Sequence, residues 1–283
     1  MQDVHAGRID GIPTLWAEGY GLPGPRTGPR AYTLRHMPLL EAKNLRKTFS
    51  GRTVVQDVSF SVEKAEVVGL LGRNGAGKTT SFRMTIGMID PDPGAGSVVT
   101  FDGTPVTTLP MYRRARLGMG YLSQEPSIFG RLTCEQNLLA ILETLDMPRG
   151  DRRIRATQLL EQFGLAHKAG HQARTCSGGE RRKLEIARAL VTNPRLILLD
   201  EPFSGVDPIA VEDLQAEITR LAKQGIAFLI TDHNVQQTLR VCDRACIIVA
   251  GSVIAQGTPK AIINDENARK AYLGNLFRGD EFE

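Results

Sequence analysis

The chain has 283 residues, of which 41% are hydrophobic, and this suits one large globular domain or a domain with a subdomain. Its 35 basic and 31 acidic residues leave a net charge of +4, too small a surplus to favour nucleic acid as a partner. The four cysteines have neither CxxC spacing nor nearby histidines placed like metal ligands, so we expect reduced residues of a cytosolic protein that serve mostly in packing. No stretch approaches the roughly 18 consecutive apolar residues of a spanning helix, so we expect no direct membrane span.

Residues 1–36 differ in composition from the rest of the chain. They are rich in Gly and Pro, contain the only tryptophan, Trp16, and have no period of 2 or 3.6. We therefore expect a disordered leader. A strand-like pattern begins at Met37, which raises the hypothesis that Met37 is the true translation start. A transit peptide is a weaker alternative, because such segments are poor in acidic residues and this one contains Asp3, Asp10 and Glu18.

Several strands are expected in the first half of the chain. Val58, Phe60 and Val62 alternate as in a half-buried strand, and the apolar run "AEVVGLLG" (65–72) is typical of a fully buried one. Two further strands are predicted within 96–103 and 116–124. From about Thr133 to Gly164 the pattern becomes helical, with apolar residues at helical spacing that include Leu138, Leu139, Leu142 and Leu145.

The second half alternates helices with apolar strands. A helix is expected after residue 177, then the strand "RLILLD" (195–200), a helix from near Pro208, the strand "IAFLIT" (226–231), a short helix and the strand "ACIIVAG" (245–251). This order is typical of βαβ units, in which helices cover both faces of a parallel sheet. The predicted fold class is therefore α/β.

The stretch "GRNGAGKTT" (72–80) matches the phosphate-binding pattern G-x-x-x-x-G-K-[ST] and lies between a buried strand and a helix. Glycines let successive backbone N–H groups surround a phosphate, and the helix N-terminus adds positive potential. Lys78 would reach the outer phosphates and Thr79 would bind Mg²⁺. The predicted nucleotide-binding residues here are Gly72, Asn74, Gly75, Ala76, Gly77, Lys78, Thr79 and Thr80. The alternative is an ordinary glycine-rich turn.

Two adjacent carboxylates, Asp200 and Glu201, end the predicted strand at 195–200. Successive side chains of a strand point to opposite sides, so the two acids can have different roles. Since ligands of open α/β sheets bind beyond the carboxyl ends of the strands, we expect Asp200 to bind Mg²⁺ and Glu201 to address the attacking water. The alternative for Glu201 is a cap of the following turn.

Three single residues could extend this site. Gln124, at a strand end, could contact Mg²⁺ or the water, and His233 could hydrogen-bond the terminal phosphate. Phe49 could stack on adenine. Taken alone, each has a simpler explanation: a surface amide, a structural histidine and a core aromatic residue.

A second glycine-containing stretch, "TCSGGERRK" (175–183), opens directly into a predicted helix far downstream of the first. A serine hydroxyl, backbone N–H groups and a helix N-terminus could form a second anion cradle. A lone Ser-Gly-Gly is more often a helix cap.

Taken in order, these motifs resemble the ATPase subunits of ABC transporters over nearly everything after Met37. The resemblance implies a P-loop NTPase core (37–243) with a mostly parallel sheet, a small antiparallel β region at its N-terminus and a helical subdomain (roughly 108–176). A C-terminal strand, helix and tail would follow in 244–283. It also implies ATP and Mg²⁺ as nucleotide and cofactor.

The same resemblance implies a homodimer. Two copies would associate head to tail, so that the signature residues of one complete the phosphate site of the other. These residues are Ser177, Gly178, Gly179 and Glu180, and Asp207 would belong to the neighbouring D-loop. The expected catalytic residues are Glu201, His233 and Gln124, and the expected metal ligands are Thr79, Gln124 and Asp200.

Longer stretches, among them "QEPSIFGRLT" (124–133), "EPFSGVDPIAV" (201–211) and "AYLGNLF" (271–277), are similar to the ATPases of lipopolysaccharide-export systems. This implies a subunit on the cytoplasmic face of a bacterial inner membrane, bound to two transmembrane export subunits through Phe129. The alternative for Phe129 is local packing. Other interpretations are a branched-chain amino-acid importer or a soluble ABC protein. The latter usually has two cassettes or a coiled-coil insertion. A small GTPase is disfavoured because no NKxD motif is present.

The chain departs from the family pattern at two positions. Cys176 stands where the signature usually has Leu, and Arg73 stands where this group often has Pro. We expect Cys176 to pack rather than react and therefore to be tolerated. Arg73 could contact the partner subunit or solvent.

Overall fold

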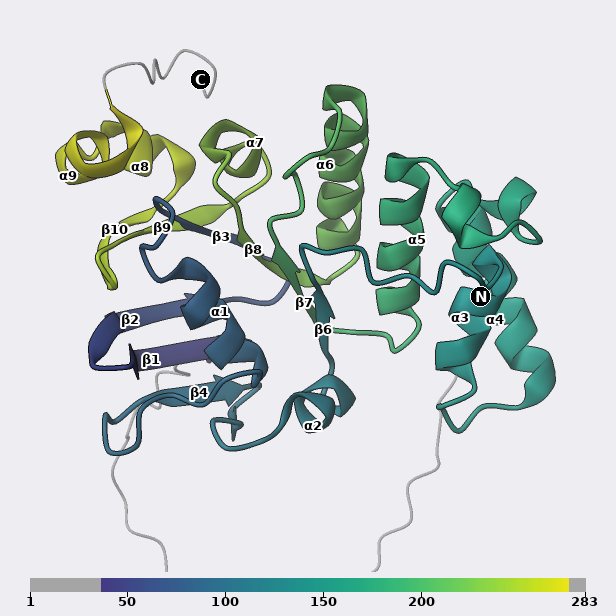
Figure 1. Cartoon of the computed structure of the whole chain (residues 1–283), viewed down its shortest axis with the longest axis horizontal. Helices are drawn as coiled ribbons and strands as arrows, with labels where there is room; N and C mark the ends of the chain where they lie inside the picture. The colour runs from purple at the N-terminus through teal and green to yellow at the C-terminus, as the bar shows by residue number, and fades with distance from the viewer. Residues whose placement is uncertain (1–36, 275–283) are drawn as a thin grey trace, which may run out of the picture. The chain divides into compact units, whose positions relative to one another are not determined.

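The computed structural model describes residues 37–274. The predicted leader and the end of the predicted tail lie outside the described residues. Ten strands within this range form one sheet, in the order β5-β4-β1-β2-β10-β9-β3-β8-β7-β6 (Figure 1). Their bounds are β1 (Leu40–Phe49), β2 (Arg52–Val62), β3 (Val67–Leu71), β4 (Val98–Phe101), β5 (Thr104–Pro105), β6 (Met119–Leu122), β7 (Leu196–Asp200), β8 (Ala227–Thr231), β9 (Arg244–Val249) and β10 (Ser252–Gly257).

Helices and short helical turns connect these strands. The α-helices are α1 (Lys78–Ile86), α2 (Met111–Arg116), α3 (Cys134–Leu142), α4 (Arg149–Gln162), α5 (Gly178–Leu190), α6 (Pro208–Lys223), α7 (Val235–Leu239), α8 (Pro259–Asn264) and α9 (Glu266–Ala268). Single 3₁₀ turns cover Ala166–Lys168 and Ala173–Thr175, and a π-helical turn covers Arg269–Leu273.

The parallel part of the sheet is buried on both faces. Strands β6, β7, β8, β3 and β9 pair in parallel, and every residue of β3, β7 and β8 is buried. Along β7, Ile197 and Leu199 join the cluster that contains α5 and α6, whereas Leu196 and Leu198 face the cluster that contains α1. This alternation follows from the two-residue period of a strand. The predicted α/β class with a mostly parallel sheet is confirmed.

Antiparallel pairing occurs in two places. The N-terminal region pairs β1 with β2 and β4, and β4 with β5, as predicted. The strand β10 also pairs antiparallel with β9, so antiparallel pairing extends beyond the N-terminal region. The two strands are joined by the two-residue turn Ala250–Gly251, with φ of 48° and 80°. Positive φ at both central residues favours such a tight hairpin.

The predicted helical stretch 133–164 forms two helices, α3 and α4. The chain leaves the helical path after Leu142, and Pro148 precedes the first residue of α4, where its fixed φ and missing N–H are tolerated. Thr133 precedes α3 as the N-cap of a capping box. Its side chain accepts from Gln136 N, and the Gln136 side chain accepts from Thr133 N. Helices α3, α4 and α5 lie together at one side of the sheet (Figure 1) and share one apolar cluster.

A buried arginine joins α1 to α2. The Arg114 side chain is fully buried, and Nη1 donates to the carbonyls of Met84 and Thr85 at 2.9 and 2.6 Å. Nε donates to Leu109 O and Nη2 to Thr107 O, both at 2.8 Å. Burial lowers the pKa of Arg114 to about 10. The guanidinium meets the carbonyl end of α1, where the helix dipole favours positive charge.

We predict that Arg114→Met lowers the free energy of unfolding by about 3 kcal/mol, because several buried carbonyls lose their donor. The matched control is Arg113→Met in the same helix, where the side chain is exposed and Nε contacts the Tyr112 hydroxyl at 3.3 Å. Its expected effect is below about 0.5 kcal/mol. Urea unfolding measures both, and equal losses in the two variants would contradict the role given to Arg114.

Candidate functional site

The predicted site residues lie together at the carboxyl ends of the parallel strands. The loop 72–80 follows β3, Gln124 follows β6, Glu201 follows β7 and His233 follows β8. A cleft of about 520 Å³ lies at these strand ends. It is lined by Val54, Asn74, Gly75, Ala76, Gly77, Lys78, Thr79, Thr80, Gln124, Glu201, Ser204 and His233.

Glycine is needed in the loop 72–80 because its backbone is left-handed and tightly packed. Gly72, Gly75 and Gly77 have φ of 154°, 79° and 105°. A Cβ at Gly72 would lie 2.2 Å from the Ile248 carbonyl oxygen, and one at Gly77 would lie 2.9 Å from that of Val54. The loop thus leaves β3 and enters α1 along a path that few other residues allow.

Lys78, the first residue of α1, lies inside this loop. Its side chain is buried, and Nζ donates to the carbonyl oxygens of Gly72 at 2.6 Å and Arg73 at 3.2 Å. Burial lowers the pKa of Lys78, while Glu201, Asp232 and Asp200 act in the opposite direction. A cationic side chain and a helix N-terminus therefore lie together at one glycine-rich concave surface, the arrangement that binds phosphate.

Asp200 and Glu201 point in different directions. Asp200 ends β7, is buried, and accepts a hydrogen bond from the Thr231 hydroxyl at 2.7 Å. Burial raises the pKa of Asp200, and the Thr231 hydrogen bond opposes this. Glu201 has the left-handed φ of 45°, and its N–H donates to Thr231 O at 2.7 Å. This sharp turn directs the Glu201 carboxylate into the cleft.

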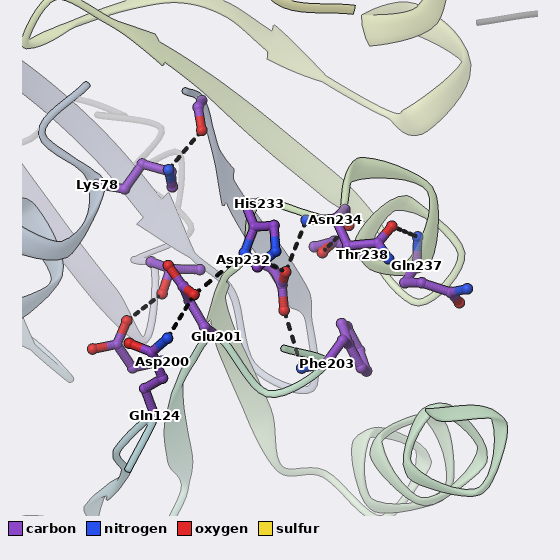
Figure 2. A network of polar contacts seen from close by, with 12 residues as sticks. Lys78, Gln124, Asp200, Glu201, Phe203, Asp232, His233, Asn234, Gln237 and Thr238 are labelled. Carbon is purple, nitrogen blue, oxygen red and sulfur yellow. Dashed lines mark hydrogen bonds and ion pairs between the residues drawn. The ribbon is translucent and has the colours of Figure 1, made fainter. Parts of the chain in front are cut away.

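Three predicted catalytic residues meet at one carboxylate oxygen (Figure 2). Glu201 Oε2 accepts a hydrogen bond from Gln124 Nε2 at 2.9 Å and lies 3.3 Å from His233 Nδ1. The Glu201 side chain is 16% exposed, and its two partners are exposed, so the contact lies at the solvent-facing side of the cleft. Three loops, each after a different strand, are joined at this point.

The side chains near the phosphate loop also suit Mg²⁺. Thr79 and Gln124 line the cleft with a hydroxyl and an amide. Asp200 lies at the end of β7, the strand next to β6, which Gln124 follows. Hard oxygen donors of this kind bind Mg²⁺, usually with only one or two carboxylates and with phosphate oxygens as further ligands. The residues present therefore fit a magnesium ion bound together with a nucleotide.

Phe49 is not among the residues that line this cleft. It ends β1, is 42% exposed, and has Lys47 Nζ 5.6 Å from its ring centroid. The hairpin that it belongs to continues into β2, which brings Val54 to the cleft. The aromatic ring is thus exposed at a neighbouring turn.

The signature stretch lines a second, adjoining cleft of about 320 Å³. This second cleft contains Gly178, Gly179 and Asp207, and it shares Gln124, Glu201 and Ser204 with the first. Ser177 begins α5 as its N-cap: Ser177 Oγ accepts from Glu180 N at 3.2 Å, and Glu180 Oε2 accepts from Ser177 N at 2.8 Å. Asp207 likewise caps α6 by accepting from Ala210 N at 3.0 Å. Beside this fixed helix start, Gly178 is exposed and Gly179 is half-buried.

The two departures from the family pattern occupy different environments. Cys176 is 3% exposed in the apolar core, and its Sγ lies 3.5 Å from Cys134 Sγ. Burial raises the pKa of the Cys134 thiol to about 12, which favours the unreactive thiol form. The Arg73 side chain is exposed.

Phe129 is an exposed aromatic residue on a well-fixed loop. Its ring is 47% exposed, and Arg188 lies 5.2 Å from the ring centroid. The buried Asn137 side chain accepts from Phe129 N at 2.8 Å and donates to Phe129 O at 3.1 Å. The loop therefore presents the ring in a defined position.

Sequence reasoning missed several residues of the site. Val54 and Ser204 line the cleft. The buried residues Thr231 and Asp232 form hydrogen bonds with Asp200 and with Phe203 N in the segment that contains Glu201. The available signal was position, because Thr231 and Asp232 directly precede His233 at the end of a buried strand.

We predict that Gly72→Ala lowers the free energy of unfolding by at least about 3 kcal/mol, because the new Cβ would collide with a backbone oxygen. The matched control is Gly75→Ala, where φ is also positive but a Cβ meets nothing within 4 Å. Only about 1 kcal/mol of backbone strain is expected there. Thermal unfolding without nucleotide compares them, and a Gly72→Ala variant as stable as Gly75→Ala would refute the packing argument.

Sequence comparisons place this arrangement among known proteins. The family model described as "ABC transporter" matches residues 55–204. The chain is 51% identical to the "Lipopolysaccharide export system ATP-binding protein LptB" of Haemophilus influenzae and 50% identical to that of Escherichia coli K12. Each match covers 86% of this chain and 100% of the relative. A "Probable ABC transporter ATP-binding protein" of Azorhizobium caulinodans is 50% identical and covers 84% of both chains.

Solved structures agree with these matches. An ATP-binding cassette of an ABC transporter in its ADP conformation superimposes with a TM-score of 0.75 at 28% identity, and covers 84% of this chain and 100% of that one. A nucleotide-free cassette gives a TM-score of 0.74 at 28% identity with the same coverage. The predicted resemblance is thus confirmed. The chain belongs to the ABC transporter family, as one of its ATP-binding, ATP-hydrolysing subunits.

Proposed function

We propose that this chain is the ATPase subunit of a transporter that exports lipopolysaccharide. The observation that carries the proposal is the 50–51% identity to the LptB proteins over their whole length. The shared region includes the complete cleft. Among residues 37–274, none of the helices has the length and apolar character to cross a membrane. We place the subunit on the cytoplasmic face of the inner membrane, bound to membrane partners, on the strength of its similarity to the LptB proteins.

Binding of ATP would use the loop 72–80 and Lys78. The α1 N-terminus would face the phosphates, and the Lys78 ammonium, now bonded to Gly72 O and Arg73 O, could turn toward them. Thr79, Asp200 and Gln124 would hold Mg²⁺. When bound, Mg²⁺ supplies positive charge that stabilises the phosphate oxygens during transfer. Phe49 would stack on the adenine base from its exposed turn.

Hydrolysis would depend on Glu201. Gln124 and His233 both approach Oε2, so Oε1 can accept a hydrogen bond from the attacking water. The carboxylate orients that water and accepts its proton, which is general-base catalysis. His233 is 51% exposed at the mouth of the cleft and can donate a hydrogen bond to the terminal phosphate. Positioning and electrostatics of this kind account for most of phosphoryl-transfer catalysis.

Two copies would bind head to tail. The signature glycines line a cleft separate from the phosphate loop of the same chain, which fits a role toward a second copy. Ser177, Gly178 and Gly179 would then close over the phosphates in the opposite cleft. The Glu180 carboxylate caps the helix start and contacts Lys168 at 3.3 Å, so its part in this role is to fix Ser177. ATP would hold the dimer closed, and hydrolysis would open it.

We predict that Glu201→Gln keeps ATP binding but lowers turnover by about 10²- to 10⁴-fold, because the amide cannot accept the proton of water. The variant should accumulate ATP-bound dimers. Phosphate release measures turnover, and size-exclusion chromatography with ATP measures dimers. Normal hydrolysis by Glu201→Gln would remove Glu201 from the proposed role.

The transport assignment is tested by co-purification from detergent-solubilised membranes of the native host. Two lipopolysaccharide-export membrane subunits should co-purify with the tagged protein. Phe129→Ala should lose at least about 90% of them, as expected for a buried aromatic anchor, while keeping the ATPase activity of the isolated subunit. Ile154→Ala is the matched control, because Ile154 is also exposed, at 58%, but lies on α4. Recovery of an amino-acid permease, or of no membrane protein, would refute the export function.

A further inference from the structure

A fully buried carboxylate, Asp232, lies at the centre of the network in Figure 2. Asp232 Oδ2 accepts a hydrogen bond from Phe203 N at 3.0 Å, and Oδ1 accepts from Asn234 N at 2.8 Å. Phe203 belongs to the loop that begins with Glu201, and Asn234 follows His233 and caps α7. One side chain therefore joins the backbones of the two loops that carry Glu201 and His233.

The Glu201 loop needs this support because its backbone is strained. A φ of 45° costs a non-glycine residue about 1 kcal/mol or more. On one side of this strained residue, the Glu201 N–H donates to Thr231 O at 2.7 Å. On the other, the Phe203 N–H donates to Asp232. The last residue of β8 and the one after it thus hold Glu201 from both sides.

The histidine ring lies between two carboxylates. His233 Nδ1 is 3.3 Å from Glu201 Oε2 and 3.6 Å from Asp232 Oδ1. Burial raises the pKa of Asp232, and the hydrogen bonds from Asn234 and Phe203 oppose this. The Asp232 carboxylate is fully buried, and both of its oxygens accept hydrogen bonds from backbone N–H groups. Its contacts are to the backbone that carries the reacting groups.

We propose that Asp232 is a positioning residue for ATP hydrolysis, which holds Glu201 and His233 as one rigid unit facing the terminal phosphate. This rests on the proposed role of Glu201. Catalytic groups must be held within a fraction of an ångström of their working positions, and hydrogen bonds from surrounding buried groups provide this support. Loss of the Asp232 acceptor should therefore affect the chemical step and leave nucleotide binding intact.

The decisive variant is Asp232→Asn in the full chain. An amide has one acceptor oxygen and one NH₂ group, so one of the two backbone N–H groups would face a donor. We expect kcat to fall about 10- to 100-fold, while KM for ATP and ATP affinity stay within about twofold. Combined with Glu201→Gln under single-turnover conditions, Asp232→Asn should cause less than about a twofold further loss, because the two residues act as a unit.

The matched control is Asp243→Asn. Asp243 Oδ2 accepts a hydrogen bond from Val67 N at 2.9 Å, at the end of β3 opposite the phosphate loop. This variant makes the same acid-to-amide change away from the cleft, where the one amide oxygen can still accept from Val67 N, and its kcat should stay within about twofold of wild type. If Asp232→Asn does not fold, Asp232→Glu keeps the charge but displaces the carboxylate, and the same loss of kcat is expected.

Three results would overturn the inference: wild-type kcat in the folded Asp232 variant, a matching rise in KM, or an equal loss of kcat in Asp243→Asn. These results are distinct from a failure of the proposed function. Normal turnover by Glu201→Gln would refute the proposed role of Glu201 itself. An inactive Glu201→Gln together with a fully active Asp232→Asn would refute only the positioning role.

Discussion

The register between β7 and β8 determines where the acidic groups of this site lie. The two strands pair in parallel from Leu196 with Ala227 to Asp200 with Thr231, so both strands end at the same level. The Thr231 hydroxyl then reaches Asp200, and the Thr231 carbonyl reaches Glu201 N. A slip of one residue would exchange the faces of every side chain and separate these groups. The apolar residues that alternate between two cores make such a slip costly.

Motifs with a local physical basis were predictable from the sequence. The glycines of 72–80 and the adjacent carboxylates at the end of β7 could be assigned roles from their residue types and from their positions at the ends of apolar strands. Parallel pairing then brings strand ends together without further information. For this reason Glu201, Gln124 and His233 could be expected to converge before any distance was known, and the structure places them around one oxygen atom.

Features that depend on distant backbone groups were not predictable. Asp232 accepts from Phe203, which is remote in the sequence, and nothing in the composition of "ITDHN" distinguishes such an acceptor from a surface acid. The position of Phe49 outside the cleft lining depends on the β1–β2 hairpin, which no local period describes. The division of 133–164 into two helices was not predicted, although Pro148 was visible in the sequence.

One feature of the sheet order governs when this chain can first bind a nucleotide during its synthesis. The strand β3, which leads into the phosphate loop, is flanked by β8 and β9, and both are encoded far downstream. Ile248 of β9 also packs against Gly72, so the loop takes part of its shape from the last third of the chain. A nascent chain on the ribosome therefore carries the motif long before it carries the site. Nucleotide binding becomes a late event of folding that reports on a nearly completed subunit.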